Sequence, residues 1–386
     1  MLDKPRPHEL EIAIFGPGYG ESLSLHVGGR WLLIDSCIYR SQTEPAVLVY
    51  LEKIGVNAAK DVDLVLATHW HDDHIRGIGR LFESCLSARF ACPVALRDRE
   101  FMELLAHYRQ QSLLASSGVD ELNRVFREFG RRKSSGSFCE IMWVIEGREL
   151  WSARVPIRGK MFDARLIAAS PCDSAVSAAI LNIGRELETN LQISNPNAPI
   201  RRISCPSQNH AAVATYLSIG RECILLGSDL EVSGLPTAGW NAVKAFLGGK
   251  DRSRVVKVPH HGSVTAHDGQ VWEELLVSSP IAIVTPFRRG SVDLPQQSDL
   301  IRINNITPNG FVTCPPKSLR VKYSSKVVQS IVSEVATSAV VSHAADRGMI
   351  RLRYDLAADD GEWNVFLAEG AVAIGDILPK VDASIA

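Results

Sequence analysis

The chain has 386 residues and a formal net charge of −1, from 42 lysines and arginines against 43 aspartates and glutamates. Hydrophobic residues make up 46% and charged residues 22%, which is typical of a globular protein rather than a disordered or fibrous one. No apolar run approaches the roughly 20 residues of a membrane-spanning helix. The first residues contain no apolar stretch of signal-peptide length, and the balanced charge gives no global attraction to an anionic membrane. These features exclude an integral membrane protein and favour a cytoplasmic location.

Strands and turns alternate in the first 70 residues. The pattern predicts a strand over 9–15, a hairpin of strands 22–27 and 30–35, a helix over 45–54 and a strand over 63–68. The last of these is almost continuously apolar, which is typical of a strand buried on both faces. Residues after Thr68 therefore lie at the carboxyl end of a core strand, where open α/β sheets usually place their chemistry.

The middle third, about residues 97–202, contains no motif that indicates chemistry. We interpret it as an insertion that covers or shapes a site. Its periodicity predicts the following elements: helices over 100–114, 119–129 and 173–185, short strands over 140–145, 149–152 and 164–169, and a surface loop over 190–202.

The pattern of the first half then recurs. We predict strands over 211–218, 223–226, 255–258 and 281–285, with a helix over 239–247. Later, 350–354 and 363–368 are predicted to form a hairpin. We therefore expect one domain over 1–299 and a small β-rich domain over 300–386.

The strongest signal is the segment 68–74, whose sequence is THWHDDH. It places three imidazoles and a carboxylate in the spacing H-x-H-x-D-H, just after a core strand: His69, His71, Asp73 and His74. Imidazole and carboxylate are ligands that suit Zn²⁺, Mn²⁺ or iron. The eight cysteines include no CxxC pair and predict neither a thiolate zinc site nor a disulfide framework.

This heptad resembles the signature of the metallo-β-lactamase fold superfamily. Three further positions match that family in order: Asp35 after the hairpin, Asp229 in LLGSD and His261 in PHHGS. The resemblance covers about residues 9–290 and implies an α/β fold, the αββα sandwich, with a dinuclear site at one edge. Within the superfamily the chain looks most like the soluble hydrolase domain of ComEC and its stand-alone relatives, on the segments GPGYGES, ILLGSDLE and HHGS. A looser resemblance is to phosphocholine esterases.

The resemblance implies two divalent metal ions, Zn²⁺ or Mn²⁺, that lie about 3.5–4 Å apart and share a hydroxide. The ligands it implies are His69 and His71 for one ion, Asp73, His74 and His261 for the other, and Asp229 as the bridge. Catalysis would also use Asp35, which would orient a ligand histidine. His260 would donate a hydrogen bond to a phosphoryl oxygen or protonate the leaving group. We expect the glycines of GPGYGES to let the backbone approach the metal centre.

Four other residues are additional candidates: Asn209, His210, His267 and Arg288. Asn209 and His210 fall where the superfamily usually has its third-motif histidine, so that His210 either ligates a metal or points outward. Arg288 follows a predicted strand at the active-site edge and is a candidate for phosphate contact.

These features predict a metal-dependent hydrolase of the phosphodiesterase or nuclease type, whose partner is a phosphoester such as a nucleic acid or a nucleotide. Two alternatives stay open, because a fold alone does not decide chemistry. One is hydrolysis of a carbonyl substrate, namely a lactam, a lactone or a thioester. The other is a non-catalytic binding subunit of a larger assembly. No protein partner can be read from the residues.

Overall fold

The computed structural model describes residues 2–17, 20–40, 42–99, 101–103, 118–192, 208–289, 292–319, 347–358 and 361–379. The helix predicted over 100–114 lies almost entirely outside these ranges, and so does most of the loop predicted over 190–202. None of the described helices is long and apolar enough to cross a membrane.

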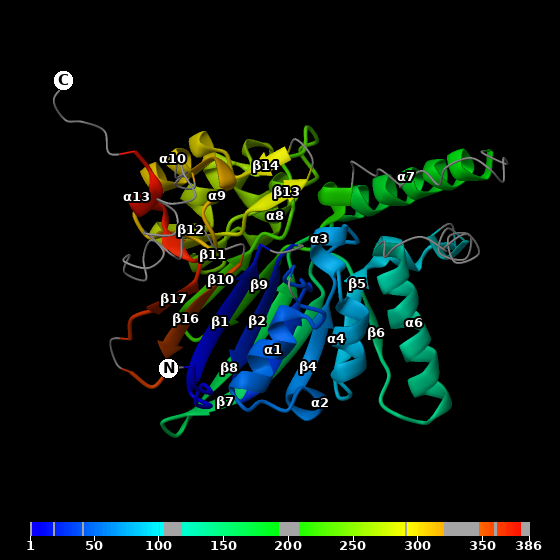
Figure 1. Ribbon diagram of the computed structural model, residues 1–386, viewed down its shortest axis with the longest axis horizontal. Coiled ribbons are helices and arrows are strands. Elements are labelled where there is room, and N and C mark those ends of the chain that lie inside the picture. The colour runs from blue at the N-terminus through cyan, green and yellow to red at the C-terminus, as the bar shows by residue number, and fades with distance from the viewer. Residues whose placement is uncertain are drawn as a thin grey trace, which may run out of the picture.

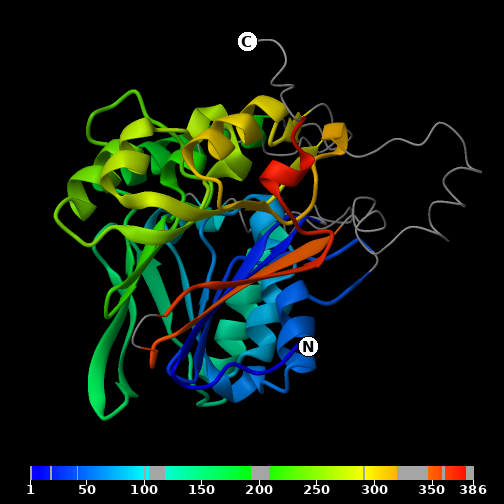
Figure 2. The same cartoon turned by 90° about the vertical axis from the view of Figure 1, so that its left-hand side faces the viewer.

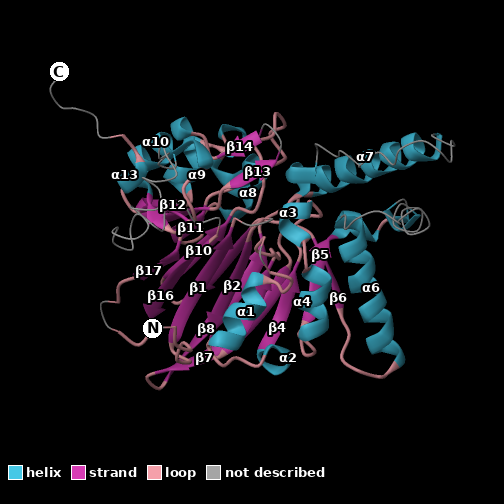
Figure 3. Cartoon of the chain, viewed as in Figure 1, coloured by secondary structure: helices cyan, strands magenta, loops and turns pink. Residues whose placement is uncertain are grey.

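Two mixed β-sheets of eight strands each form the centre of the described molecule (Figure 1, Figure 3). The first sheet has the strand order β17 (Asn364–Glu369), β16 (Gly348–Asp355), β1 (Glu9–Gly16), β2 (Ser22–Val27), β3 (Arg30–Ile34), β4 (Val62–Leu66), β5 (Arg89–Pro93) and β6 (Ile141–Val144). The second has the order β18 (Val372–Ala373), β15 (Gly310–Val312), β12 (Leu276–Val284), β11 (Ser253–Lys257), β10 (Glu222–Leu226), β9 (Thr215–Ile219), β8 (Lys160–Ala168) and β7 (Glu149–Ile157).

The sheets pack face to face around one apolar core. Alternate residues of β1, such as Leu10, Ile12 and Ile14, pack in this core with Leu166 and Leu217 from the second sheet. This alternation follows from the two-residue period of a strand, which sends successive side chains to opposite faces. All eight residues of β1 are buried, since its other face is also covered.

Helices cover the two outer faces. On the first sheet lie α1 (Ala46–Lys53), α4 (Ile78–Ser84) and α6 (Gly118–Ser134), and on the second lie α8 (Trp240–Leu247), α9 (Gly269–Glu274) and α10 (Gln297–Ile306). Figure 2 shows the blue helices and the yellow-green helices on opposite sides of the strands. The other α-helices in the described ranges are α2 (Ala58–Asp61), α3 (Asp72–Ile75), α7 (Asp173–Gln192) and α13 (Ile374–Ile377). The predicted αββα metallo-β-lactamase sandwich is therefore confirmed.

The described part of residues 300–386 does not form a separate domain, contrary to our expectation. β16 pairs with β1 in the first sheet, and β15 pairs with β12 in the second. The predicted hairpin does exist as β16 and β17, but it extends the first sheet because β1 would otherwise expose an unpaired edge.

The segment 97–202 is likewise more than an insertion around a site. Its strands β6, β7 and β8 complete the two sheets, and β8 pairs with β9 in register. Residues 211–214 are predicted as the start of a strand, but Ala211 ends the short turn Gln208–Ala211, residues 212–214 are irregular, and β9 begins only at Thr215. Apolar composition alone could not separate this buried turn from a buried strand.

Candidate metal centre

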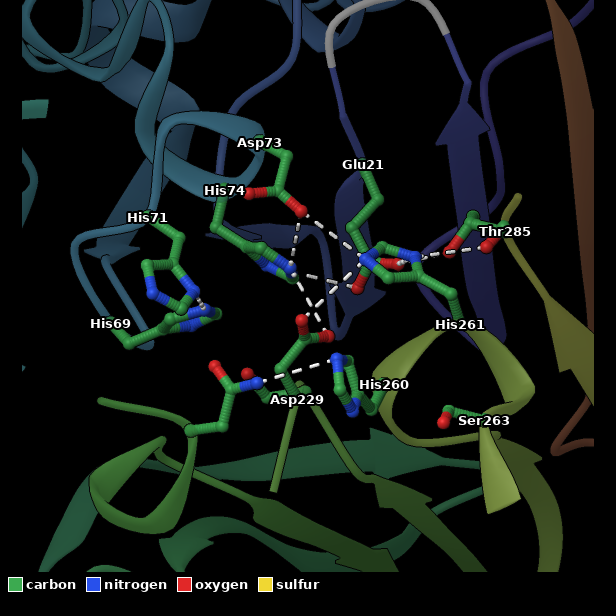
Figure 4. Close-up of polar contacts among 12 residues, drawn as sticks. Glu21, His69, His71, Asp73, His74, Asp229, His260, His261, Ser263 and Thr285 are labelled. Carbon is green, nitrogen blue, oxygen red and sulfur yellow. Dashed lines mark hydrogen bonds and ion pairs between the residues drawn. The ribbon is translucent and has the colours of Figure 1, made fainter. Parts of the chain in front are cut away.

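The candidate ligands follow the carboxyl ends of strands that lie at the same edge of the sandwich. The heptad follows β4, Asp229 follows β10, and His261 follows β11. β10, β11 and β12 run parallel to one another, so their carboxyl ends meet at this edge. The predicted placement after strand ends therefore brings segments together that are far apart in the sequence (Figure 4).

Four of the predicted ligands converge. Asp73, His74, Asp229 and His261 each offer one ligand atom, and these atoms all lie within 4.8 Å of one another. His74 Nε2 is 3.2 Å from Asp229 Oδ1, and His261 Nε2 is 3.2 Å from Asp73 Oδ2. His74, Asp229 and His261 are almost completely buried.

His69 and His71 lie beside this group but not within it. His69 Nε2 is 3.1 Å from His71 Nδ1, and the ring centroids of His69 and His74 are 4.2 Å apart. These two imidazoles therefore form a neighbouring pair beside the four-residue group. Burial and the neighbouring His74 hold the pKa of His69 well below its usual value, so that its ring stays neutral and able to ligate.

Asp35 anchors the heptad from behind. Its carboxylate accepts hydrogen bonds from the Thr68 amide and the Thr68 hydroxyl, each at 2.7 Å, and contacts His74 Nδ1 at 2.7 Å. His74 Nε2 is thereby directed toward Asp229 (Figure 4). Burial raises the pKa of Asp35, although the neighbouring His74 opposes this shift.

The backbone is strained at the residues that bear or flank the ligands. Four non-glycine residues here have left-handed φ values: Asp35 (59°), Ser228 (46°), His260 (46°) and His261 (53°). Hydrogen bonds hold this conformation, since Ser228 Oγ donates to Thr68 Oγ1 at 2.7 Å and the His260 amide donates to the Ser228 carbonyl at 2.9 Å. Such strain is often found at functional sites.

The electrostatics of the cluster suit a bound cation. Burial opposes a charge on His74 and on His261, but neighbouring carboxylates outweigh it and raise the pKa of His74 well above its usual value and that of His261 to about 9. Burial likewise opposes the charges on Asp73 and Asp229, yet the two histidines hold the pKa of each carboxylate below its ordinary value. The two histidines and the two carboxylates thus stabilise one another's charged forms, and a divalent cation bound here would take the place of the imidazole protons.

The residues present fit divalent metal ions. In the described part of the chain, His74 Nε2 and Asp229 Oδ1 are buried and have no hydrogen-bond partner, although they face each other. Buried polar atoms normally have partners, and an imidazole nitrogen and a carboxylate oxygen are both ligand atoms for Zn²⁺ or Mn²⁺. His261 Nδ1 donates to the Thr285 carbonyl at 2.9 Å, which leaves Nε2 as the ligand atom.

His260 lies next to this cluster on its solvent side. Its Nδ1 is 2.7 Å from Glu231 Oε1, and its Nε2 is 3.3 Å from Asn209 Nδ2. The predicted candidate Asn209 therefore contacts His260 directly, and its Nδ2 also donates to Glu231 at 3.2 Å. Sequence reasoning missed Glu231, although its position two residues after Asp229 could have indicated it.

The other additional candidates lie farther out. His210 is half-buried and outside the four-ligand group, and its Nδ1 has no hydrogen-bond partner among the described residues. His267 packs its ring against Trp272, with the centroids 6.4 Å apart. Arg288 is exposed on β13 (Phe287–Arg289), which pairs with β14 (Val292–Leu294). It follows Phe287, whose ring stacks on His261 with the centroids 5.1 Å apart.

A second residue that sequence reasoning missed is Glu21, the glutamate of GPGYGES. It is completely buried, and its Oε2 is 3.6 Å from His261 Nδ1. Its signal in the sequence was weak, because the glycines around it suggested a role for the loop backbone only.

Comparisons with known proteins give a family match and a named relative. Residues 16–129 match the model of the family described as the metallo-beta-lactamase superfamily. A protein of Methanocaldococcus jannaschii, named a probable metallo-hydrolase, is 28% identical over 93 residues, which are 24% of this chain and 40% of that relative. The match thus spans less than half of the relative's length.

Solved structures give fold likenesses at low identity. The metallo-beta-lactamase fold protein YhfI of Bacillus subtilis is 12% identical, with a TM-score of 0.37, over 80% of this chain and 96% of that one. Zn²⁺-bound PqqB of Methylobacterium extorquens is 12% identical, with a TM-score of 0.29, over 61% and 58%. The short form of human tRNase Z is 12% identical, with a TM-score of 0.30, over 64% and 76%.

The fold and the site define a class, that of α/β sandwich proteins with a His/Asp cluster able to hold a metal ion at the edge of two facing sheets. Residues 16–129, which include the heptad, match the metallo-beta-lactamase superfamily, and the described part of the chain has the metallo-β-lactamase fold.

Proposed function

We propose that the protein is a metal-dependent hydrolase, and more specifically a phosphodiesterase that acts on a nucleic acid, a nucleotide or a related phosphoester. The observation that carries the hydrolase assignment is the convergence of Asp73, His74, Asp229 and His261 in one buried cluster. Support for the phosphoester comes from the resemblance of the HHGS and GES segments to the ComEC type of hydrolase and from the polar groups around the cluster.

Divalent ions, when bound, would supply a water-derived nucleophile at neutral pH and stabilise the negative charge that develops on the substrate. We propose two such ions, Zn²⁺ or Mn²⁺, one held by His69 and His71 and the other by Asp73, His74 and His261, with Asp229 between them. Asp35 fixes the His74 ring through Nδ1, and the Thr285 carbonyl fixes the His261 ring in the same way.

His260 and Arg288 are proposed to contact the substrate. Glu231 contacts Nδ1 of His260 and so orients the ring, whose Nε2 side faces Asn209 and the cluster. We assign His260 a hydrogen bond to a phosphoryl oxygen or to the leaving group. Arg288 is exposed one residue after the Phe287 ring that packs on His261, a position from which a guanidinium can reach a phosphate.

The test is hydrolysis of bis(p-nitrophenyl) phosphate by the purified chain, first metal-free and then reloaded with Mn²⁺ or Zn²⁺. Asp229→Ala should lower the metal-dependent rate by about 100-fold or more, because it removes the proposed bridging carboxylate. Asp163→Ala is the matched control, since Asp163 lies on the exposed surface of β8 and pairs only loosely with Arg154 at 3.7 Å. Circular dichroism and metal analysis verify that each variant is folded and loaded.

The same preparations are assayed with a thioester, a lactone and a lactam. Turnover of one of these with no phosphodiester cleavage would replace the phosphodiesterase proposal with a carbonyl hydrolase. Full activity in Asp229→Ala would contradict the bridging role. A folded, metal-loaded chain that hydrolyses none of these substrates would favour a non-catalytic binding subunit.

A further inference from the structure

Directly behind the ligand cluster lies a buried ion pair that the proposed mechanism does not use. Glu21 and Lys257, the last residue of β11, are 0% and 1% exposed, and Lys257 Nζ is 2.7 Å from Glu21 Oε1. Removing two charges from water is costly, and burying an unpaired one costs far more. A lysine buried to this extent requires its carboxylate partner.

Glu21 lies on the Nδ1 side of two ligand imidazoles, those of His74 and His261. Its Oε1 is 3.9 Å from His74 Nδ1, and its Oε2 is 3.6 Å from His261 Nδ1 (Figure 4). Oε2 also accepts a hydrogen bond from the Thr285 hydroxyl. Because the Thr285 carbonyl accepts the His261 Nδ1 proton, Glu21 and His261 are held by the same residue.

Glu21 also belongs to a second group with the geometry of a cation site. One ligand atom each from Glu21, Asp35 and His74 lie within 4.8 Å of one another, and all three residues are buried. This group shares His74 with the metal centre but faces its other nitrogen, because Glu21 and Asp35 lie at Nδ1 whereas Asp229 lies at Nε2. A divalent ion bound here would have to replace the proton that Nδ1 shares with Asp35. The Lys257 ammonium already lies against this group through Glu21.

We propose that Lys257 is the resident cation of the Glu21–Asp35–His74 group. Its ammonium neutralises Glu21, confines divalent ions to the Asp73–His74–Asp229–His261 cluster, and prevents an unbalanced charge behind His74 and His261. Glu21 and Lys257 are thus positioning residues that act through the ligand histidines. This role rests on the metal centre of the proposed function but not on the identity of its substrate.

The experiment measures metal binding rather than turnover. The full chain is stripped with a chelator and titrated with Zn²⁺ by equilibrium dialysis, and Co²⁺ spectra report the ligand field. The variants are Glu21→Gln, Lys257→Met and the double variant, which remove one charge, the other, and both. Lys244→Met is the matched control, because it breaks a lysine–carboxylate ion pair outside the ligand cluster, that of Lys244 with Asp268 at 2.8 Å.

In Glu21→Gln the Lys257 ammonium loses its carboxylate partner, and this unpaired charge should weaken Zn²⁺ binding by about 10–100-fold. Lys257→Met should bind one more Zn²⁺ per chain than the wild type and show an altered Co²⁺ spectrum, because the freed carboxylate becomes a ligand. The double variant should return to the wild-type stoichiometry and to within about 3-fold of its affinity, since a neutral pair of similar volume is usually tolerated. Lys244→Met should match the wild type.

Unchanged stoichiometry, affinity and spectrum in folded Glu21→Gln would overturn this inference and leave the proposed hydrolase intact. A double variant that binds Zn²⁺ as weakly as Glu21→Gln would also overturn it, because charge balance would then not be the cause. If Lys257→Met does not fold, Glu21→Gln and the double variant still decide the question. A wild-type chain that binds no divalent ion would overturn the proposed function as well.

Discussion

At the scale of single residues, the site depends on how each ligand imidazole is held from behind. His74 and His261 both use Nδ1 for a protein acceptor, respectively the Asp35 carboxylate and the Thr285 carbonyl, and so direct Nε2 to the cluster. Such contacts fix the tautomer and the orientation of a ligand ring. The affinity of the site should therefore depend on residues that do not touch the metal.

Asp35→Asn tests this dependence. The Asp35 carboxylate faces three donors, from the Thr68 amide, the Thr68 hydroxyl and His74, and an amide cannot accept from all of them because its NH₂ group is itself a donor. We expect Zn²⁺ affinity to fall by about 10–100-fold with the fold retained. Chelator competition measures the affinity, and Asp163→Asn on the exposed face of β8 is the control. Wild-type affinity in Asp35→Asn would contradict the orienting role.

At the scale of elements, the loop between β1 and β2 is shaped to pack against the heptad. The Glu21 amide donates to the Asp73 carbonyl at 2.9 Å. A Cβ added at Gly20 would lie 1.7 Å from that carbonyl oxygen, and Gly20 has a φ of +147°. This contact supports the interpretation that a glycine of GPGYGES allows the backbone to approach the metal centre.

Gly20→Ala should therefore destabilise the fold strongly. The new methyl group must displace either the β1–β2 loop or the helix α3 that carries Asp73 and His74, and we expect a loss of about 3 kcal/mol or more in the free energy of unfolding. Zn²⁺ binding should weaken in parallel. Gly29→Ala is the matched control, because Gly29 also has a positive φ of +84° but no atom within 4 Å of an added Cβ, so that it should lose only about 1 kcal/mol. Equal losses in urea denaturation would show that the close approach is unimportant.

At the scale of the whole molecule, the last described strands of the chain belong to both sheets. β16 lies between β1 and β17, and Arg353 on β16 forms a buried ion pair with Glu11 on β1 at 2.6 Å. β15 and β18 extend the second sheet in the same way. The described part of the chain should therefore unfold as one unit rather than as a hydrolase domain followed by an independent domain.

Leu352→Ala tests whether the described part of the chain unfolds as one unit. Leu352 is completely buried on β16 within the core shared by the two sheets, so its truncation should lower the free energy of unfolding by about 2–5 kcal/mol. The variant should keep a single transition, shifted as a whole, when unfolding is followed both by far-UV circular dichroism and by Zn²⁺ release. Leu367→Ala on β17 is the control, because that side chain is 41% exposed and should lose less than about 1 kcal/mol. Two separate transitions would favour an independent C-terminal domain after all.

The sequence by itself determined the features that depend on neighbouring residues. The apolar alternation of β1, the buried run of β4 and the glycine turn between β2 and β3 follow from local periodicity and turn chemistry. The ligand types and their place after strand ends could be predicted for the same reason, since the heptad and the acid of LLGSD are each contained in a few consecutive residues.

Only the tertiary structure decided the contacts between distant segments. Sequence spacing does not indicate that Glu21 pairs with Lys257, that Glu231 orients His260, or that β16 lies beside β1. Each of these depends on the order and register of strands in a sheet, which pattern and propensity leave open because many pairings bury the same apolar faces. A buried charge has a stable place only where the completed fold supplies its partner, and the partner here comes from a distant segment of the chain.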